Sequence, residues 1–162
     1  MAKGKAKAGS ANSGLLALNR KARHDYFIDE TMEAGLVLKG VEIKSMREGR
    51  VNLRDSYVVV RNGEAWVRNM HVSPYEQAST HEEALDPMRS RKLLLSKRQI
   101  RTLEESTSQK GMTIIPLRLY LNNNRAKLEI GIARGKKLHD KRDSIAEREA
   151  KRKMDRVLRG RY

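Results

Sequence analysis

Two stretches of alternating polar and apolar residues constrain the fold of this chain most strongly. Residues 113–121 (TIIPLRLYL) and 125–133 (RAKLEIGIA) each repeat with period two, and Asn122–Asn124 lie between them. Such alternation is typical of strands with one face on a core, so we expect an antiparallel hairpin with Lys127 pointing outward. Pro116 lacks a backbone donor and should lie at an edge or a bulge. The side chains expected to face the core are Ile115, Leu117, Leu119, Leu121, Ala126, Leu128, Ile130 and Ile132.

Other local signals predict further antiparallel strands. Asn62 and Gly63 separate two β-rich runs, and the tight turn of a hairpin needs the positive φ angles that these residue types adopt. We expect a mainly β protein, a small antiparallel β-barrel, because closure removes exposed strand edges. Residues 73–91 show little periodicity and are expected to form a long surface loop.

About three short helices are expected to flank the barrel. Ser96 and Gln99 have the spacing of a capping box, at the start of a helix that stops at Gly111. Asn19 is the expected N-cap of a short basic helix. Residues 41–49 can close one or two further helical turns before a glycine stop.

The distribution of charge indicates the kind of partner. The length of 162 residues suits one domain, and its net charge of +15 is concentrated at the two ends. Residues 1–23 carry +6 and residues 134–162 carry +7, whereas residues 24–133 carry only +2. A near-neutral body with cationic ends is typical of a protein that binds nucleic acid. The small number of aromatic residues favours a folded RNA, recognised by its shape.

The sequence predicts no catalytic, metal or cofactor site. The absence of cysteine excludes disulfides and thiolate ligands, and no apolar run is long enough for a membrane span or a signal peptide, so we expect a cytoplasmic protein. The four histidines lack metal-ligand spacing. His24 and His139 each precede an aspartate, as in metal-dependent phosphohydrolases, but neighbouring side chains should point apart. We therefore expect a protein that is not an enzyme.

Residues 135–162 form a basic tail with its own pattern. Apolar residues recur at helical spacing between Ala146 and Leu158, arginines form a second stripe, and Ser144 and Glu147 have the spacing of a capping box. An isolated helix of this length is marginal in water, and the arginines repel one another. We expect the tail to be disordered alone and helical among phosphates. A helix docked on the body through its apolar stripe is the alternative.

Four motifs occur in a specific order: KARHDYFI, EAGL, RKLLL and GKKLHDKR. In these motifs, and over nearly all of the chain from Leu18 to Glu149, the sequence resembles the family of small protein B, the SsrA-binding proteins of bacterial trans-translation. The resemblance implies an oligonucleotide-binding-like β-barrel in residues 15–134. A disordered basic segment, residues 1–14, would precede it, and the tail would become helical on the ribosome.

The resemblance also implies a function. Such a protein binds the tRNA-like domain of transfer-messenger RNA and brings it to stalled ribosomes, in a complex that includes elongation factor Tu. Its tail would occupy the empty mRNA channel and the decoding centre of the small subunit. We expect a monomer that binds no membrane. The alternatives are a ribosome-associated structural or assembly protein that binds rRNA and, less favoured, an RNA-processing enzyme.

Single residues can be carried over from the family motifs. The RNA-binding positions implied on the body are Asn19, His24, Glu33, Tyr57, Lys92, Leu94 and Lys127. Those implied in the decoding centre and mRNA channel are Gly135, Lys136, Lys137, His139, Asp140, Lys141, Arg142, Arg148 and Arg152, with His139 stacked on an rRNA base. Alternatives stay open at two positions. Glu33 could be a solvated strand residue or orient a neighbouring arginine, and Leu94 could be an ordinary core residue.

Overall fold

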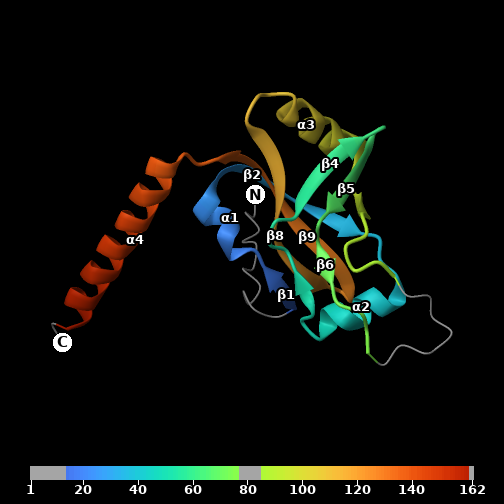
Figure 1. Ribbon diagram of the computed structural model, residues 1–162, viewed down its shortest axis with the longest axis horizontal. Coiled ribbons are helices and arrows are strands. Elements are labelled where there is room, and N and C mark those ends of the chain that lie inside the picture. Colours follow the sequence, from blue (N-terminus) through green and yellow to red (C-terminus); the bar gives the residue numbers. More distant parts are fainter. Residues whose placement is uncertain (1–13, 77–84, 161–162) are drawn as a thin grey trace, which may run out of the picture.

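The computed structural model describes residues 14–76 and 85–160, with the side chains of residues 138–140 outside the described part (Figure 1). Strands predominate, and the helices lie around them. The elements in chain order are β1 (Leu15–Leu18), α1 (Arg20–Asp25), β2 (Tyr26–Leu36), α2 (Gly40–Arg47), β3 (Val51–Asn52), β4 (Tyr57–Arg61), β5 (Glu64–Arg68), β6 (His71–Val72), β7 (Arg91–Leu94), α3 (Lys97–Thr107), β8 (Met112–Asn122), β9 (Arg125–Gly135) and α4 (Leu138–Arg159).

Six antiparallel strands pair around a closed ring. β8 pairs with β4, β4 with β5, β5 with β7, β7 with β2, β2 with β9, and β9 again with β8. β1 adds to β8 beside the ring, and β3 and β6 form a separate two-stranded sheet. The ring encloses one apolar core, and closure leaves few strand edges free for pairing with other chains. The predicted mainly β fold is confirmed.

The β8–β9 hairpin confirms the alternating pattern in one strand and corrects it in the other. Leu128, Ile130 and Ile132 of β9 lie in the barrel core as expected. The ladder register shifts beyond Pro116, so the proline lies at a predicted bulge. That extra residue reverses the alternation in β8. Leu119 stays in the core, whereas Ile115 and Leu117 belong to a second cluster on the outer face of the sheet, and the prediction of one common face is wrong for those two.

The second apolar cluster holds α1 against the outside of the barrel. Ala22 of α1 is 2% exposed and packs with Ile115, Leu117 and Ala133. Asn19 begins this helix as predicted, but its side chain does not cap it. Its amide instead donates to the carbonyl oxygens of Pro116, at 2.9 Å, and Leu53, at 3.4 Å. Asn19 thus fastens the start of α1 to the barrel.

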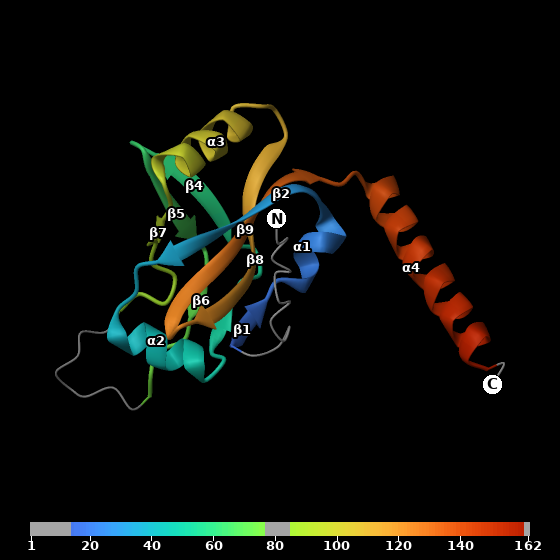
Figure 2. The same ribbon diagram turned by 180° about the vertical axis from the view of Figure 1, so that it is seen from behind.

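Two more helices cover opposite ends of the barrel (Figures 1 and 2). The predicted capping box of α3 is present, since Ser96 accepts from the Gln99 amide and Gln99 accepts from that of Ser96. The regular helix ends at Thr107, four residues before the end that was expected at Gly111. α2 is followed by Gly49 at φ +74°, as the predicted glycine stop requires.

A buried ion cluster anchors β7, at the end of the segment predicted to be a surface loop. Arg91 is 1% exposed, and its Nε donates to Glu42 of α2 at 2.6 Å. Arg89 donates to the same carboxylate. Arg91 also donates to the carbonyl oxygens of Met70, at 2.6 Å, and Pro87, at 3.1 Å. The expectation that the loop extends to Arg91 is wrong, because this side chain is part of the interior.

The tail is a single long helix that projects from the body (Figure 1). α4 begins at Leu138, six residues before Ser144, so the predicted capping box there is wrong. Near the end of α4, Met154 is 68% exposed and Leu158 is 59% exposed. Against the described residues, this part of the apolar stripe is therefore not docked, contrary to the docked alternative. Disorder of the tail in the free protein stays a prediction.

Candidate RNA-binding surface

Four of the seven RNA-binding positions predicted on the body lie together on the outside of the barrel. Gly35 of β2 pairs with Leu94 of β7 on one side and with Lys127 of β9 on the other. Glu33 and Lys92 each lie two residues from a member of this row, and residues two apart in a strand share a face. We call these five residues the β2 face. The two ladder registers thereby join β2 to segments that lie about sixty and about ninety residues further along the chain.

Glu33 organises the polar part of the β2 face. Its carboxylate lies 4.0 Å from the Lys127 ammonium and accepts a hydrogen bond from the Tyr120 hydroxyl. Burial, with the hydrogen bond to Glu33, raises the pKa of Tyr120 well above its ordinary value, so the phenol remains a donor. Glu33 is therefore a partner of Tyr120 and Lys127 as well as a solvated strand residue, and the groups it contacts are a tyrosine and a lysine, not an arginine.

The apolar part of the β2 face is open to solvent. Leu94 is 56% exposed, so the alternative that it is an ordinary core residue is wrong. A Cβ at Gly35 would lie 3.1 Å from the Leu94 Cβ. The absence of a side chain at Gly35 therefore lets Leu94 lie close to the β2 backbone. Lys92 lies at the rim, 3.1 Å from Glu64. An exposed leucine between cationic groups offers contact to a ribose or a base while the lysines meet phosphates.

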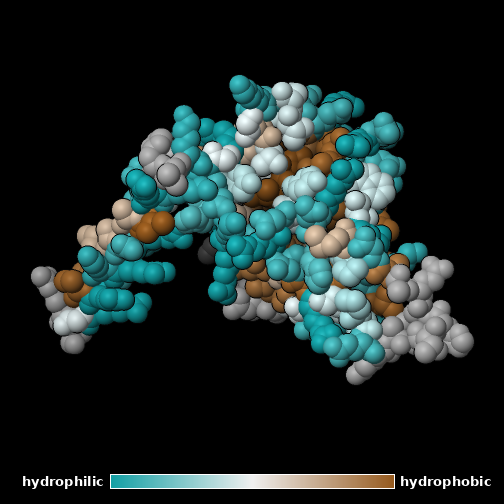
Figure 3. All heavy atoms as spheres, in the orientation of Figure 1, coloured by the Kyte–Doolittle hydropathy of each residue, from teal (hydrophilic) through white to brown (hydrophobic). Residues whose placement is uncertain are grey.

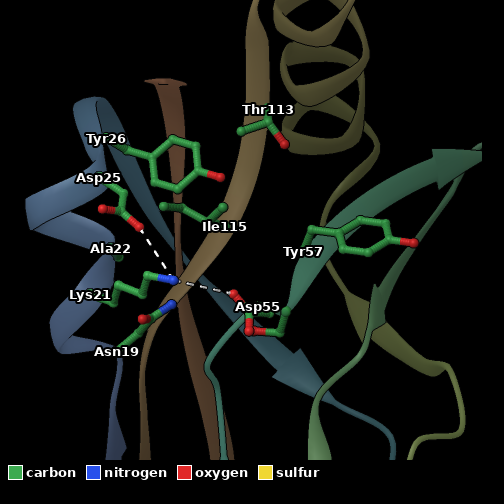
Figure 4. A pocket seen from close by; sticks show the side chains of 10 residues that line it. Asn19, Lys21, Ala22, Asp25, Tyr26, Asp55, Tyr57, Thr113 and Ile115 are labelled. Atoms are coloured by element: carbon green, nitrogen blue, oxygen red, sulfur yellow. Dashed lines mark ion pairs between the residues drawn. The ribbon is translucent and has the colours of Figure 1, made fainter. Parts of the chain in front are cut away.

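The other three body positions, Asn19, His24 and Tyr57, lie around α1 rather than on the β2 face. A cavity of about 310 Å³ opens between α1 and the start of β4, and both Asn19 and Tyr57 line it (Figure 4). In its centre, Lys21 lies 3.7 Å from Asp25 and 3.8 Å from Asp55. The predicted RNA-binding positions therefore form two groups. The Asn19 amide donates both of its hydrogen bonds to backbone carbonyl groups of the barrel, so in this structure it positions α1.

Asp25 joins α1 to the base of the tail. It is hydrogen-bonded to His24 Nδ1 at 2.8 Å and lies 3.5 Å from the Lys141 ammonium. The expectation that this histidine and aspartate point apart is wrong. Burial by itself raises the Asp25 pKa, but the His24 hydrogen bond and the Lys141 charge outweigh it, and the pKa lies below its ordinary value. Among the described residues, no three His, Asp or Glu side chains are placed to hold a metal ion.

Lys136 makes the second connection between the tail and α1. Its backbone amide donates to the Asp25 carbonyl at 2.8 Å. Its ammonium donates to the Arg23 carbonyl at 3.2 Å and to the Ser144 hydroxyl at 2.8 Å. The ammonium thus satisfies a carbonyl at the C-terminal end of α1, where a cation is also favoured by the helix dipole. Two lysines predicted for the decoding centre hold the tail to the body in this structure.

The remaining tail positions lie along the connection and on α4. Gly135 is the last residue of β9, Lys137 follows in the connection, and Arg142, Arg148 and Arg152 are exposed on the helix. The side chains of His139 and Asp140 lie outside the described residues. The cationic stripe predicted for the tail is therefore present on a helix, and the base stacking assigned to His139 stays a prediction.

The sequence analysis did not identify Tyr120 and Arg118 as site residues. The Arg118 guanidinium lies over the Tyr120 ring, 4.9 Å from its centroid, and Arg118 Nε donates to Glu129 at 2.7 Å. The alternating pattern that predicts an outward Lys127 could also have identified them. Tyr120 pairs with Lys127 and Arg118 pairs with Glu129, so all four lie on the outward face of the hairpin. Nothing in the sequence around Asp25 indicates its connection to the tail, because Lys136 and Lys141 are more than a hundred residues away.

Comparisons with known proteins show the family to which the chain belongs. The family model described as SmpB protein matches residues 16–160. The SsrA-binding protein of Clostridium botulinum (strain Hall) is 56% identical over 149 residues, which cover 92% of this chain and 94% of the relative. That of Clostridium novyi (strain NT) is 58% identical over 149 residues, with the same coverage.

A solved structure described as "tmRNA-SmpB: a journey to the center of the bacterial ribosome" is also similar. One of its chains matches with a TM-score of 0.65 and 44% sequence identity, covering 80% of this chain and 93% of its own length. The family match continues through the barrel, the connection and α4. The chain therefore belongs to the SmpB family, whose members compared above are SsrA-binding proteins.

Proposed function

We propose that this protein binds the tRNA-like domain of transfer-messenger RNA and delivers it to stalled ribosomes for trans-translation. The barrel holds the transfer-messenger RNA, through the β2 face and the surface around α1. The tail follows the vacant mRNA channel of the small subunit and reaches the decoding centre. Elongation factor Tu is a partner in the delivered complex, and the work takes place in the cytoplasm.

One observation carries the proposal: a single family match covers the RNA-facing barrel and the cationic helix together. The barrel supplies a compact patch with Lys92, Lys127 and an exposed leucine. The tail, together with Arg134 just before it, supplies a net charge of +7. Phosphate neutralisation by such side chains gives RNA affinity, and a folded, nearly neutral barrel gives selectivity by shape.

The protein acts by binding rather than by catalysis. Asp25 and His24, the pair with the strongest resemblance to a reactive site, are occupied by each other and by lysines. In the described part of the chain, no helix is long and apolar enough to cross a bilayer.

Truncation after Gly135 tests the division of labour. We expect the truncated protein to keep most of its affinity for the tRNA-like RNA, within about tenfold of the full chain at roughly 0.2 M salt, where phosphate contacts of the tail are weakened. It should be unable to support tagging of nascent chains on stalled ribosomes. A full-length variant with residues 136–160 scrambled is the control for charge and composition, and it should also be inactive in tagging.

Two results would contradict the proposal. A truncated barrel that is folded by circular dichroism but has lost RNA binding would show that barrel and tail are not separate sites. Alternatively, RNA recovered with the full-length protein from cells could be bulk rRNA without enrichment of transfer-messenger RNA. That result would favour the ribosome-associated assembly function.

A further inference from the structure

A second cavity, of about 540 Å³, lies between α1, the outer face of β8–β9 and α4. Figure 3 shows the open space between α4 and the body, with hydrophilic residues along both sides. Four arginines line the cavity, Arg20 and Arg23 from α1, Arg118 from β8, and Arg148 from α4. Three separate segments of the chain therefore direct guanidinium groups toward one space.

The positive charge of this cavity is poorly compensated. Arg118 pairs with Glu129, the one acidic residue that lines the cavity. Among the described residues, Arg20, Arg23 and Arg148 have no carboxylate within ion-pair distance. Within the described part of the chain, the hydrogen bond of the Arg148 side chain is a long one, 3.4 Å to the Ser144 carbonyl. Like charges around a concave surface repel one another, and an anion in the cavity would relieve that repulsion.

The fold holds Arg148 in this place. α4 starts from a connection that is fixed to α1 by the Lys136 bonds to Arg23 and Asp25 and by the Lys141–Asp25 ion pair. Arg148 lies seven residues after Lys141, two helical turns further along the same side of α4. The contacts at the base of the tail thus turn this arginine toward α1.

We propose that the four-arginine cavity binds phosphate groups of an RNA backbone, gripped jointly by α1 and α4. This inference rests on the proposed function, since it names a further contact of the same RNA-binding protein. Guanidinium groups suit the ligand, because their planar pairs of donors match phosphate oxygens. The cavity also adjoins the β2 face: Arg118 stacks on Tyr120, which pairs with Lys127. The backbone of a single RNA strand can therefore run from Lys127 to the cavity.

The test measures how RNA affinity depends on salt for full-length Arg20→Gln, Arg23→Gln and Arg148→Gln. The probes are the transcribed tRNA-like domain and an unrelated RNA hairpin of equal length. Each lost phosphate contact should reduce the slope of log K against log salt by about 0.7–0.9. Arg101→Gln, an exposed arginine of α3 outside the cavity, is the control and should leave the slope unchanged.

A double variant tests whether α1 and α4 share one phosphate. If they do, Arg20→Gln with Arg148→Gln should lose less affinity than the product of the two single losses, because the second change acts on a contact already weakened. If the affinity lost by the double variant equals the product of the two single losses, the two arginines act independently, and the proposal that α1 and α4 share one phosphate is overturned.

The outcomes separate this inference from the proposed function. Equal slopes for wild type and all three variants, with preference for the tRNA-like RNA retained, would overturn the cavity alone. Reduced slopes with equal affinity for both RNAs would support the cavity and contradict the proposed function. Inorganic pyrophosphate and polyglutamate serve as further probes. Binding of either by wild type but not by Arg148→Gln, with unchanged RNA slopes, would assign the cavity to a free phosphate compound or an acidic peptide and overturn the RNA assignment.

Discussion

Replacement of Glu42 by glutamine should show how strongly the buried ion cluster fixes β7 and, with it, Lys92 and Leu94. The Glu42 carboxylate is 4% exposed and accepts from Arg91 at 2.6 Å, from Arg89, and from the Lys39 amide at 2.9 Å. Glutamine keeps the shape but removes the charge. It also replaces one acceptor oxygen by a donor that faces other donors. Arg91 would then be a buried cation without a counter-charge.

The expected loss is about 3–5 kcal/mol in the free energy of unfolding, the range for breaking one partner of a buried ion pair. Arg91 keeps its bonds to the Met70 and Pro87 carbonyl oxygens, and Arg89 can turn to solvent from its 26% exposed position, which favours the lower half of that range. The whole free energy of unfolding of a domain of this size is only about 5–15 kcal/mol, so the variant should be clearly less stable.

Urea unfolding followed by tryptophan fluorescence measures the effect. Trp66 is the single tryptophan and pairs with Lys92 across β5 and β7, so it reports on the strand in question. The matched control is Glu64→Gln, which breaks the exposed Lys92–Glu64 pair and should cost under about 1 kcal/mol. If Glu42→Gln proved no more costly than Glu64→Gln, the cluster would not anchor β7.

The same cluster predicts a pH dependence. Burial raises the Glu42 pKa, but hydrogen bonds from Arg89, the Lys39 amide and Arg91 outweigh burial and hold the pKa below its ordinary value. Because the pKa of Glu42 is lower in the folded state, its ionisation stabilises the fold fully when the pH is above the pKa of the unfolded state, about 4.3. That stabilisation is lost as the pH falls through the folded-state pKa. The stability difference between wild type and Glu42→Gln should therefore shrink in acid. A difference independent of pH would contradict this assignment.

Substitutions in three places probe the candidate RNA-binding surface, the tail and the fold. Lys127→Ala and Glu33→Ala should each weaken binding of the tRNA-like RNA by about 1.5–3 kcal/mol with unchanged circular dichroism, and normal affinity in both would remove the β2 face from the interface. His139→Ala should impair tagging on stalled ribosomes but not RNA binding in solution, and His139→Phe should retain more activity than alanine if stacking is the contribution. Gly131→Ala should lower the free energy of unfolding in urea by about 1–3 kcal/mol, because the new Cβ would lie 3.0 Å from Ile28 Cγ2 and 3.1 Å from Leu117 Cδ1, and a neutral result would contradict tight packing at this site.

Local patterns in the sequence were enough to predict several elements. The β4–β5 turn has Asn62 at φ +51° and Gly63 at φ +71°, as the residue types require. Ser96 and Gln99 start α3 as predicted. These features depend on groups a few residues apart, so the chemistry of neighbouring side chains and backbone decides them. The cationic ends are equally a property of the sequence, and with them the expectation of a nucleic-acid partner.

The tertiary structure decided where the strand pattern changes and which residues meet. One bulge beyond Pro116 turns Ile115 and Leu117 toward α1, and no local signal gives the face on which a bulge places its neighbours. Arg91 looked like a loop cation, yet it is buried because Glu42, 49 residues away, supplies its counter-charge.

The candidate sites show the same division. The sequence supplies Glu33, Leu94 and Lys127 as separate residues, and only the registers on both sides of Gly35 bring them into one row. The four-arginine cavity likewise needs Arg148 to reach α1 across the fold. Side-chain types and short-range pairs follow from the sequence because their energies are local. The candidate RNA-binding surfaces follow only from closure of the barrel, because contacts between distant segments depend on packing of the whole chain.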